Sequence, residues 1–176
     1  MNPLALLMPT HRASVSAFVL GQALLAMIDA LRLAFGTAPI PGFIPLFVIW
    51  WVCFSLFANR RRHAGRGTGL AVLPVILAIL AKGIGAMVGI GMRLFAGMMT
   101  FAEEQGVDTT DQIALNEAMM DPGFQPAFQA WLEADEARLL EMVSAGAWPS
   151  FIAFWVVAGV FGLWFATLQR NGSGTA

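Results

Sequence analysis

Four apolar runs dominate this chain, and their lengths limit what it can fold into. They cover residues 13–35, 42–58, 69–99 and 148–168. A helix rises about 1.5 Å per residue, so about 20 apolar residues cross the hydrocarbon core of a bilayer. Charged residues make up only 12% of the chain, compared with about 25% in typical soluble domains. The sequence therefore predicts an all-α integral membrane protein with four transmembrane helices, in a single membrane domain over residues 1–176.

The runs differ in length and in the signals at their ends. Thr10 is a candidate N-cap of the first run, and Gly36 followed by Pro39 ends it. The second run is short for a crossing, since about 17 residues is the lower limit. The third run is longer than one crossing needs, so we expect it to tilt or to extend into water.

A polar and acidic segment, residues 101–147, separates the last two runs. It holds ten of the eleven acidic residues and one basic residue, Arg138, so its net charge is −9. Thr109 has capping-box spacing for a first soluble helix, which DPG at 121–123 ends. A second helix is predicted from Pro126 to the residue before Gly146. Apolar residues recur at helical spacing in it, so this helix should be amphipathic.

The link between the second and third runs, NRRRHAGRGTG, carries a cluster of basic residues: Arg60, Arg61, Arg62, His63 and Arg66. Four crossings place this link on the same side as both termini, which contribute Arg12 and Arg170. Positively charged short loops stay in the cytoplasm. We therefore predict that both termini are cytoplasmic. The five basic residues are predicted to act as a topology signal that also contacts anionic headgroups.

Other interpretations of this link lack the residues that they require. A phosphate-binding P-loop has the pattern GxxxxGK[ST] after a strand, and GRGTG lacks its lysine and its spacing. Nucleic-acid binding needs a basic surface over a whole domain rather than one short loop. Cys53 is the single cysteine of the chain, and no spacing of ligands suits a metal ion. The sequence predicts no metal, no cofactor and no nucleic-acid partner.

Two stretches resemble a bacterial family. Residues 10–21, THRASVSAFVLG, are similar to the GRASRSEFW-type opening of the family catalogued as domain of unknown function 805. Residues 58–76, ANRRRHAGRGTGLAVLPVI, are similar to its RRLHDxGRSGWW signature, with Arg60, Arg61 and His63 at matching positions. Ala64 stands where the signature has aspartate, so any role of that aspartate is not carried over.

The resemblance covers residues 10–100 and leaves out the acidic segment. It implies a small multispan protein of the bacterial inner membrane and no established chemistry. With the predicted topology, segment 101–147 becomes a helical insertion in the periplasm.

Charged residues inside the predicted spans are the strongest functional indications, because a charge in a bilayer is costly unless it is paired or hydrated. Asp29 and Arg32 are spaced for an ion pair on one helix face. Lys82 lies near the centre of the third span if this span covers residues 70–91, and Asp29 is then its candidate partner. If the membrane covers the later part of the run instead, Lys82 reaches the cytoplasm.

Gly85 and Gly89 form a GxxxG pattern within GIGAMVGIG. Small residues at this spacing allow two helices to approach closely, which includes self-association. We interpret the pair as a helix-packing site.

Three classes of function compete. A structural or accessory subunit of a membrane assembly is favoured, because it needs no catalytic residue and the acidic segment offers a surface to a basic partner. The alternative is a small-solute or ion pathway that uses Lys82 and Asp29 and needs an oligomer to enclose a pore. An intramembrane enzyme ranks third, since Asp29 alone provides no acid–base pair. We therefore expect a non-enzymatic protein whose partners are the lipid bilayer and other membrane subunits or further copies.

Overall fold

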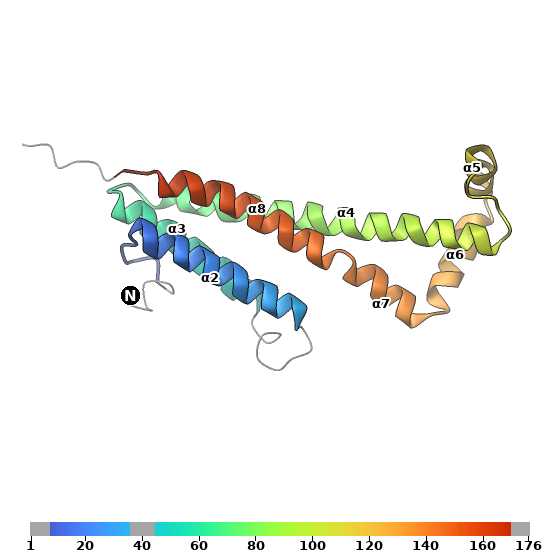
Figure 1. Ribbon diagram of the computed structural model, residues 1–176, viewed down its shortest axis with the longest axis horizontal. Helices are drawn as coiled ribbons and strands as arrows, with labels where there is room; N and C mark the ends of the chain where they lie inside the picture. Colours follow the sequence, from blue (N-terminus) through green and yellow to red (C-terminus); the bar gives the residue numbers. More distant parts are fainter. Residues whose placement is uncertain (1–7, 36–44, 170–176) are drawn as a thin grey trace, which may run out of the picture. The chain divides into compact units, whose positions relative to one another are not determined.

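The computed structural model describes residues 8–35 and 45–169, and the regular structure in these ranges is entirely helical. Figure 1 shows the elements in chain order: α2 (Val15–Ala34), α3 (Leu46–His63), the 3₁₀ turn η1 (Gly69–Ala71), α4 (Val72–Glu104), α5 (Gln112–Met120), α6 (Phe124–Glu133), α7 (Glu136–Ser144) and α8 (Ala147–Ala166). The predicted all-helical fold is confirmed for the described ranges.

Three stretches of the described chain are long and apolar enough to cross a membrane: Val15–Ala34, Gly69–Glu104 and Glu136–Ala166. They correspond to the first, third and fourth predicted spans, from which they differ at the ends. Helix α3 is not among them, because three of its 18 residues are arginines in its last turn. Residues 42–44, with which the second predicted span begins, lie outside the described ranges. The count of four spans therefore stays a prediction.

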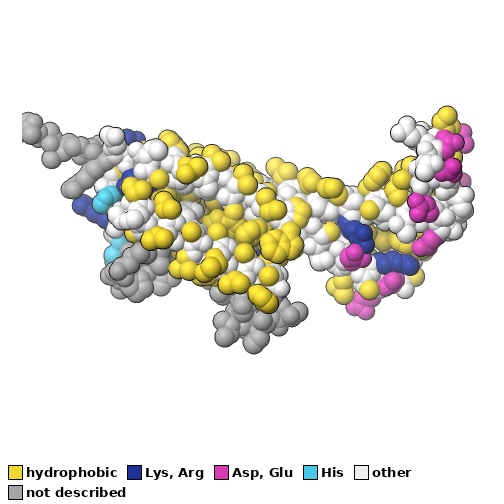
Figure 2. Space-filling model, viewed as in Figure 1, with side chains coloured by type: hydrophobic (Ala, Val, Ile, Leu, Met, Phe, Trp, Pro, Cys, Tyr) yellow, Lys and Arg dark blue, Asp and Glu magenta, His cyan; other side chains and the backbone are white. Residues whose placement is uncertain are grey.

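The chain divides into two compact units. The first unit comprises residues 1–84 and 151–176, and the second unit comprises residues 85–150. The second unit is larger than the predicted segment 101–147, because α4 is a single helix of 33 residues whose later half packs against α6. Most acidic side chains in Figure 2 belong to this second unit.

Three buried phenylalanines form the core of the first unit and bring together helices α2, α3 and α8. The ring of Phe57 on α3 lies 5.4 Å from that of Phe18 on α2 and 4.9 Å from that of Phe165 on α8. All three side chains are at most 1% exposed. Edge-to-face contacts of this kind favour one relative orientation of the rings, so they help to fix the relative positions of these three helices.

Aromatic residues also form the core of the second unit. Phe101 on α4 contacts Phe124, Phe128 and Trp131 on α6, with ring centroids 5.3–5.7 Å apart. These residues lie on one side of α6, and their burial explains why this short helix is stable in spite of the acidic residues around it.

A close backbone crossing joins α4 to the end of α7 within the second unit. A Cβ atom at Gly89 would lie 2.5 Å from the carbonyl oxygen of Ala145, and one at Gly146 would lie 2.8 Å from that of Ala86. Real Cβ atoms do not approach this closely, so both positions require glycine. Gly85, one turn before Gly89, is buried as well. The predicted packing site at Gly89 thus makes a contact within the chain.

Three predicted helix starts are wrong, and one predicted helix is two. Ser14 rather than Thr10 caps α2, and Asp111 rather than Thr109 caps α5. The helix predicted from Pro126 is α6, which begins two residues earlier at Phe124, followed by α7. The two are separate because the Asp135 side chain accepts a hydrogen bond from the backbone N–H of Ala137 and begins a new helix. Aspartate side chains compete in this way with the continuation of a helix.

The glycine crossing predicts different effects for two neighbouring substitutions, Gly89→Ala and Gly91→Ala. Both raise helix propensity by about 0.5–1 kcal/mol. Only the Cβ atom at position 89 meets backbone atoms, and the forced shift should cost about 1–3 kcal/mol. Gly91 has nothing within 4 Å of such an atom, so it is the matched control.

Thermal unfolding of the detergent-solubilised protein, followed by circular dichroism, measures both effects. We expect a lower Tm for Gly89→Ala and an equal or higher Tm for Gly91→Ala. An equal rise in Tm for the two variants would contradict the crossing.

Candidate functional site

The end of α3 carries Arg60, which binds the C-terminal end of α8. Its Nε atom donates to the carbonyl oxygen of Phe165 at 3.1 Å, and one terminal nitrogen donates to that of Ala166 at 3.1 Å and also to that of Leu168. The last carbonyl groups of a helix have no partner within it, and a positive charge there is favourable. Arg60, which is only 2% exposed, therefore caps α8.

Arg61 is also turned into the protein. Its Nε atom donates to the carbonyl oxygen of Gly67, and its guanidinium lies 5.8 Å from the centre of the Phe165 ring. It therefore ties the loop after α3 to the end of α8. Burial lowers the pKa of both Arg60 and Arg61 from the ordinary value, and the charge of Arg66 lowers the pKa of Arg61 further. Guanidinium groups are basic enough to stay charged at neutral pH.

The predicted headgroup contact is wrong for Arg60 and Arg61, because both side chains are buried and bonded to backbone carbonyls. Arg62 and Arg66 are exposed, and His63 is half-buried. Successive residues on a helix point about 100° apart, so three consecutive arginines cannot all face the same surroundings. This geometry was a signal in the sequence that not every basic residue of the link would face headgroups.

Asn59, which the sequence analysis did not single out, joins the N-terminal segment to α3. The side-chain amide of Asn59 donates to the carbonyl oxygen of Met8 at 2.8 Å. The backbone carbonyl oxygen of Asn59 accepts from the backbone N–H of Ala13 at 3.1 Å. Together with Arg60 and Arg61, it makes the last turn of α3 the meeting point of three segments.

A second polar cluster lies deeper in the first unit, around Asp29 on α2. Arg32 pairs with Asp29 at 3.1 Å, and the indole N–H of Trp155 on α8 donates to the other carboxylate oxygen at 3.0 Å. Asp29 is only 2% exposed. Lys82 on α4 is half-buried, and its ammonium group is attracted by Asp29 and repelled by Arg32.

The structure therefore brings the predicted residues Asp29 and Lys82 into one electrostatic neighbourhood, and it adds two direct partners of Asp29. Arg32 was foreseen from its helical spacing. Trp155 was missed, although an indole N–H in an apolar helix needs a partner and so carried a usable signal. The cluster links α2, α4 and α8 through charge and hydrogen bonds.

The second unit holds a polar cleft of about 240 Å³ between α4, α6 and α7. Arg93 forms an ion pair with Glu141, and the indole of Trp131 donates to Glu104 at 2.7 Å. The guanidinium of Arg138 stacks over the Trp131 ring at 3.9 Å. Each of these charged groups already has a partner within the unit, so ion pairs and hydrogen bonds among the lining side chains hold the cleft in shape.

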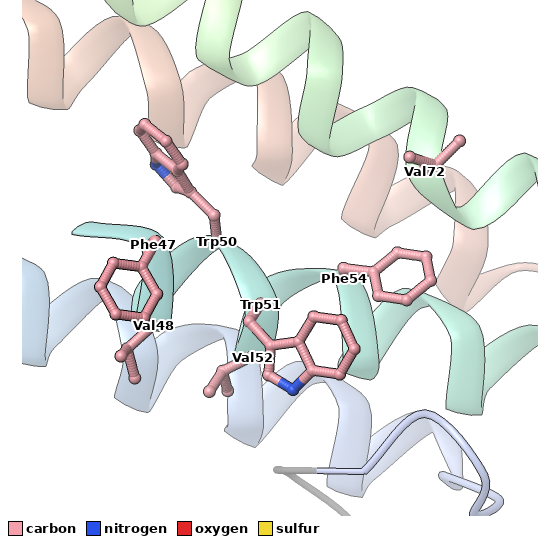
Figure 3. Close-up of a pocket in the computed structure, with 7 residues that line it drawn as sticks. All are labelled: Phe47, Val48, Trp50, Trp51, Val52, Phe54 and Val72. Atoms are coloured by element: carbon pink, nitrogen blue, oxygen red, sulfur yellow. The ribbon is translucent and has the colours of Figure 1, made fainter. Parts of the chain in front are cut away.

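An apolar groove of about 650 Å³ lies in the first unit, beside α3 (Figure 3). Its lining consists of aromatic and valine side chains: Phe47, Val48, Trp50, Trp51, Val52, Phe54 and Val72. Phe47 is 67% exposed and Trp51 is 52% exposed, so the groove is open to the outside.

Comparisons of the chain with protein-family models, curated proteins and solved structures find no match. The resemblance to the family catalogued as domain of unknown function 805 rests on the two quoted stretches and stays a prediction. In this chain, the signature positions Arg60 and Arg61 hold the end of α8 in place.

The capping contacts predict that Arg60→Gln destabilises the first unit far more than Arg62→Gln. Hydrogen bonds to charged groups contribute about 1.5–3 kcal/mol each, and Arg60 makes three. Bonds made by one side chain are not additive, so we expect a total loss of about 2–4 kcal/mol. Replacement of the exposed Arg62 should lower the free energy of unfolding by less than about 0.5 kcal/mol. Hydrogen exchange at the end of α8 should also accelerate in Arg60→Gln alone. Similar losses for the two variants would exclude a capping role for Arg60.

The Asp29 cluster predicts an order of coupling energies. Double-mutant cycles should combine Asp29→Asn with Arg32→Gln and, separately, with Lys82→Gln. We expect the free energy of coupling to Arg32 to be about 1–3 kcal/mol and larger than that to Lys82, because Arg32 makes the direct 3.1 Å contact. Unfolding in detergent micelles provides the free energies. A stronger coupling to Lys82 would show that the pair of Asp29 with Lys82 contributes more than the pair of Asp29 with Arg32.

Proposed function

We propose that this chain is a four-span protein of the bacterial inner membrane that serves as a structural or accessory subunit of a membrane assembly. The observation that carries the proposal is that the charged groups within its helical bundle bind neighbouring helices. Arg60 on α3 caps α8, and Asp29 on α2 accepts a hydrogen bond from Trp155 on α8. Such contacts are suited to holding helices together.

Exposed apolar side chains support the placement in a membrane. On α8 they recur every three or four residues: Trp148, Ile152, Val156, Val160, Leu163 and Trp164, each at least 50% exposed. Trp148 and Trp164 are about 24 Å apart along the helix at about 1.5 Å per residue. Tryptophan is enriched at both membrane interfaces, and a bilayer would cover the apolar stripe between them. Figure 2 shows comparable apolar side chains over one face of the first unit.

The proposed topology follows from the distribution of charge. We assign the link after α3 to the cytoplasm, together with both termini, because its exposed Arg62 and Arg66 agree with the rule that positively charged short loops stay inside. The acidic helices then lie in the periplasm, and α3 provides the fourth crossing with its arginines at the inner interface.

The second unit offers a surface for a partner protein. Ile113, Met120, Leu140 and Val143 are 65–75% exposed among acidic residues. Apolar centres with charged rims are typical of protein interfaces, and the acidic rim favours a partner with basic residues. We therefore place the partner contact on the periplasmic helices.

Gentle extraction from the native membrane, followed by native mass spectrometry, tests the proposal. We expect a stoichiometric complex with a second membrane protein. The substitution pair Ile113→Asp and Met120→Asp should release the partner, and Leu163→Ala, an exposed position on α8, is the control that should retain it. A monomer or homo-oligomer of the unmodified chain would refute the accessory role.

The alternative is a small-solute or ion pathway formed by an oligomer. The half-buried Lys82, near Asp29 and Arg32, favours it, because charges inside a membrane mark many transport pathways. Reconstituted vesicles should show no ion flux above that of empty vesicles if the chain is a scaffold. Flux that Lys82→Gln abolishes would instead establish the pathway.

A further inference from the structure

The apolar groove beside α3 stays open to the outside, although Trp50, Val52 and Phe54 of its lining also contact the core of the first unit. Figure 3 shows the aromatic side chains spread along α3, with Val72 across from them on α4. Trp51 and Phe47 are more than half exposed. A volume of about 650 Å³ lies within the range of about 300–1,000 Å³ that is usual for small-molecule sites. The groove is therefore large enough for a ligand and offers it almost only apolar contacts.

Two exposed arginines follow the groove residues of α3 in the direction of the proposed cytoplasmic side. Arg62 follows the groove residue Phe54 by two helical turns on α3, or about 12 Å at about 1.5 Å per residue. Arg66 lies in the loop that leads to the groove residue Val72. Arg60 and Arg61 are bound to carbonyl groups, whereas Arg62 and Arg66 face outward. One end of the apolar groove is thus close to guanidinium groups that face solvent.

We propose that the groove binds an acyl chain of an anionic phospholipid whose phosphate is held by Arg62 and Arg66. A phospholipid joins an apolar chain to an anionic group in one molecule, which matches the order of apolar lining and basic residues along α3. Arginine binds phosphate with a planar fork of donors. The two arginines favour a phospholipid over an apolar helix of a partner protein, because only the phospholipid brings an anionic group to them. The inference rests on the proposed membrane placement.

Quenching of tryptophan fluorescence by brominated lipids tests the site. The full chain is reconstituted in phosphatidylcholine vesicles that contain, at equal mole fraction, either phosphatidylglycerol or phosphatidylcholine with brominated acyl chains. The difference between the unmodified chain and Trp51→Phe isolates the signal of Trp51, and phenylalanine keeps an aromatic ring in the groove. We expect brominated phosphatidylglycerol to quench Trp51 several-fold more than brominated phosphatidylcholine.

Arginine variants separate a binding site from general attraction of anionic lipid. Arg62→Gln and Arg66→Gln should each reduce the preference for phosphatidylglycerol. Arg12→Gln is the matched control, because Arg12 is exposed and lies on the same proposed side of the membrane. The Arg12→Gln variant should prefer phosphatidylglycerol as strongly as the unmodified chain does. An equal reduction in all three variants would mean diffuse attraction and would overturn the site.

Two further outcomes have separate meanings. If the chain inserts into vesicles but both lipids quench Trp51 equally, the groove has no anionic lipid site, and a partner helix becomes the better occupant. If the chain does not float with vesicles after an alkaline wash, the membrane placement fails, and the lipid site fails with it.

Discussion

The contact between Arg60 and the last carbonyl groups of α8 is the interaction on which the first unit most depends. A helix end leaves backbone oxygens without partners, and a buried end must find them in another part of the chain. Arg60 provides these partners from α3, more than a hundred residues away in sequence. This contact places Phe165 against Phe57, and Phe57 in turn packs against Phe18. The helix cap and the aromatic core therefore stabilise the same arrangement of three helices.

The Asp29 cluster provides a second polar connection among the same helices and adds α4. Burial of a carboxylate is costly unless hydrogen bonds and opposite charges compensate for it. Arg32 and Trp155 provide that compensation directly, and Lys82 adds a second positive charge nearby. In a bilayer the loss of one partner would leave the buried carboxylate less fully compensated, so such a cluster favours one arrangement of helices over others.

The second unit is held by different means. Its aromatic core needs no long-range charge contact, and the crossing at Gly89 and Gly146 depends on the absence of side chains. Its charged groups lie at the surface, where ion pairs contribute little to stability. The exposed acidic groups give this surface a negative charge, which agrees with the proposal of an accessory role for this unit.

The sequence by itself determined the helical class, the long apolar helices α2, α4 and α8, and the location of the acidic residues. These properties follow from local composition and helical period, which neighbouring residues decide. The local pair of Asp29 with Arg32 also followed from spacing alone. Only the tertiary structure decided that Arg60 and Arg61 turn inward, that Trp155 binds Asp29, and that Gly146 opposes Gly89. The reason is physical: a charged or small residue can satisfy its requirements with many partners, and the distant helix that packs beside it determines which one it meets.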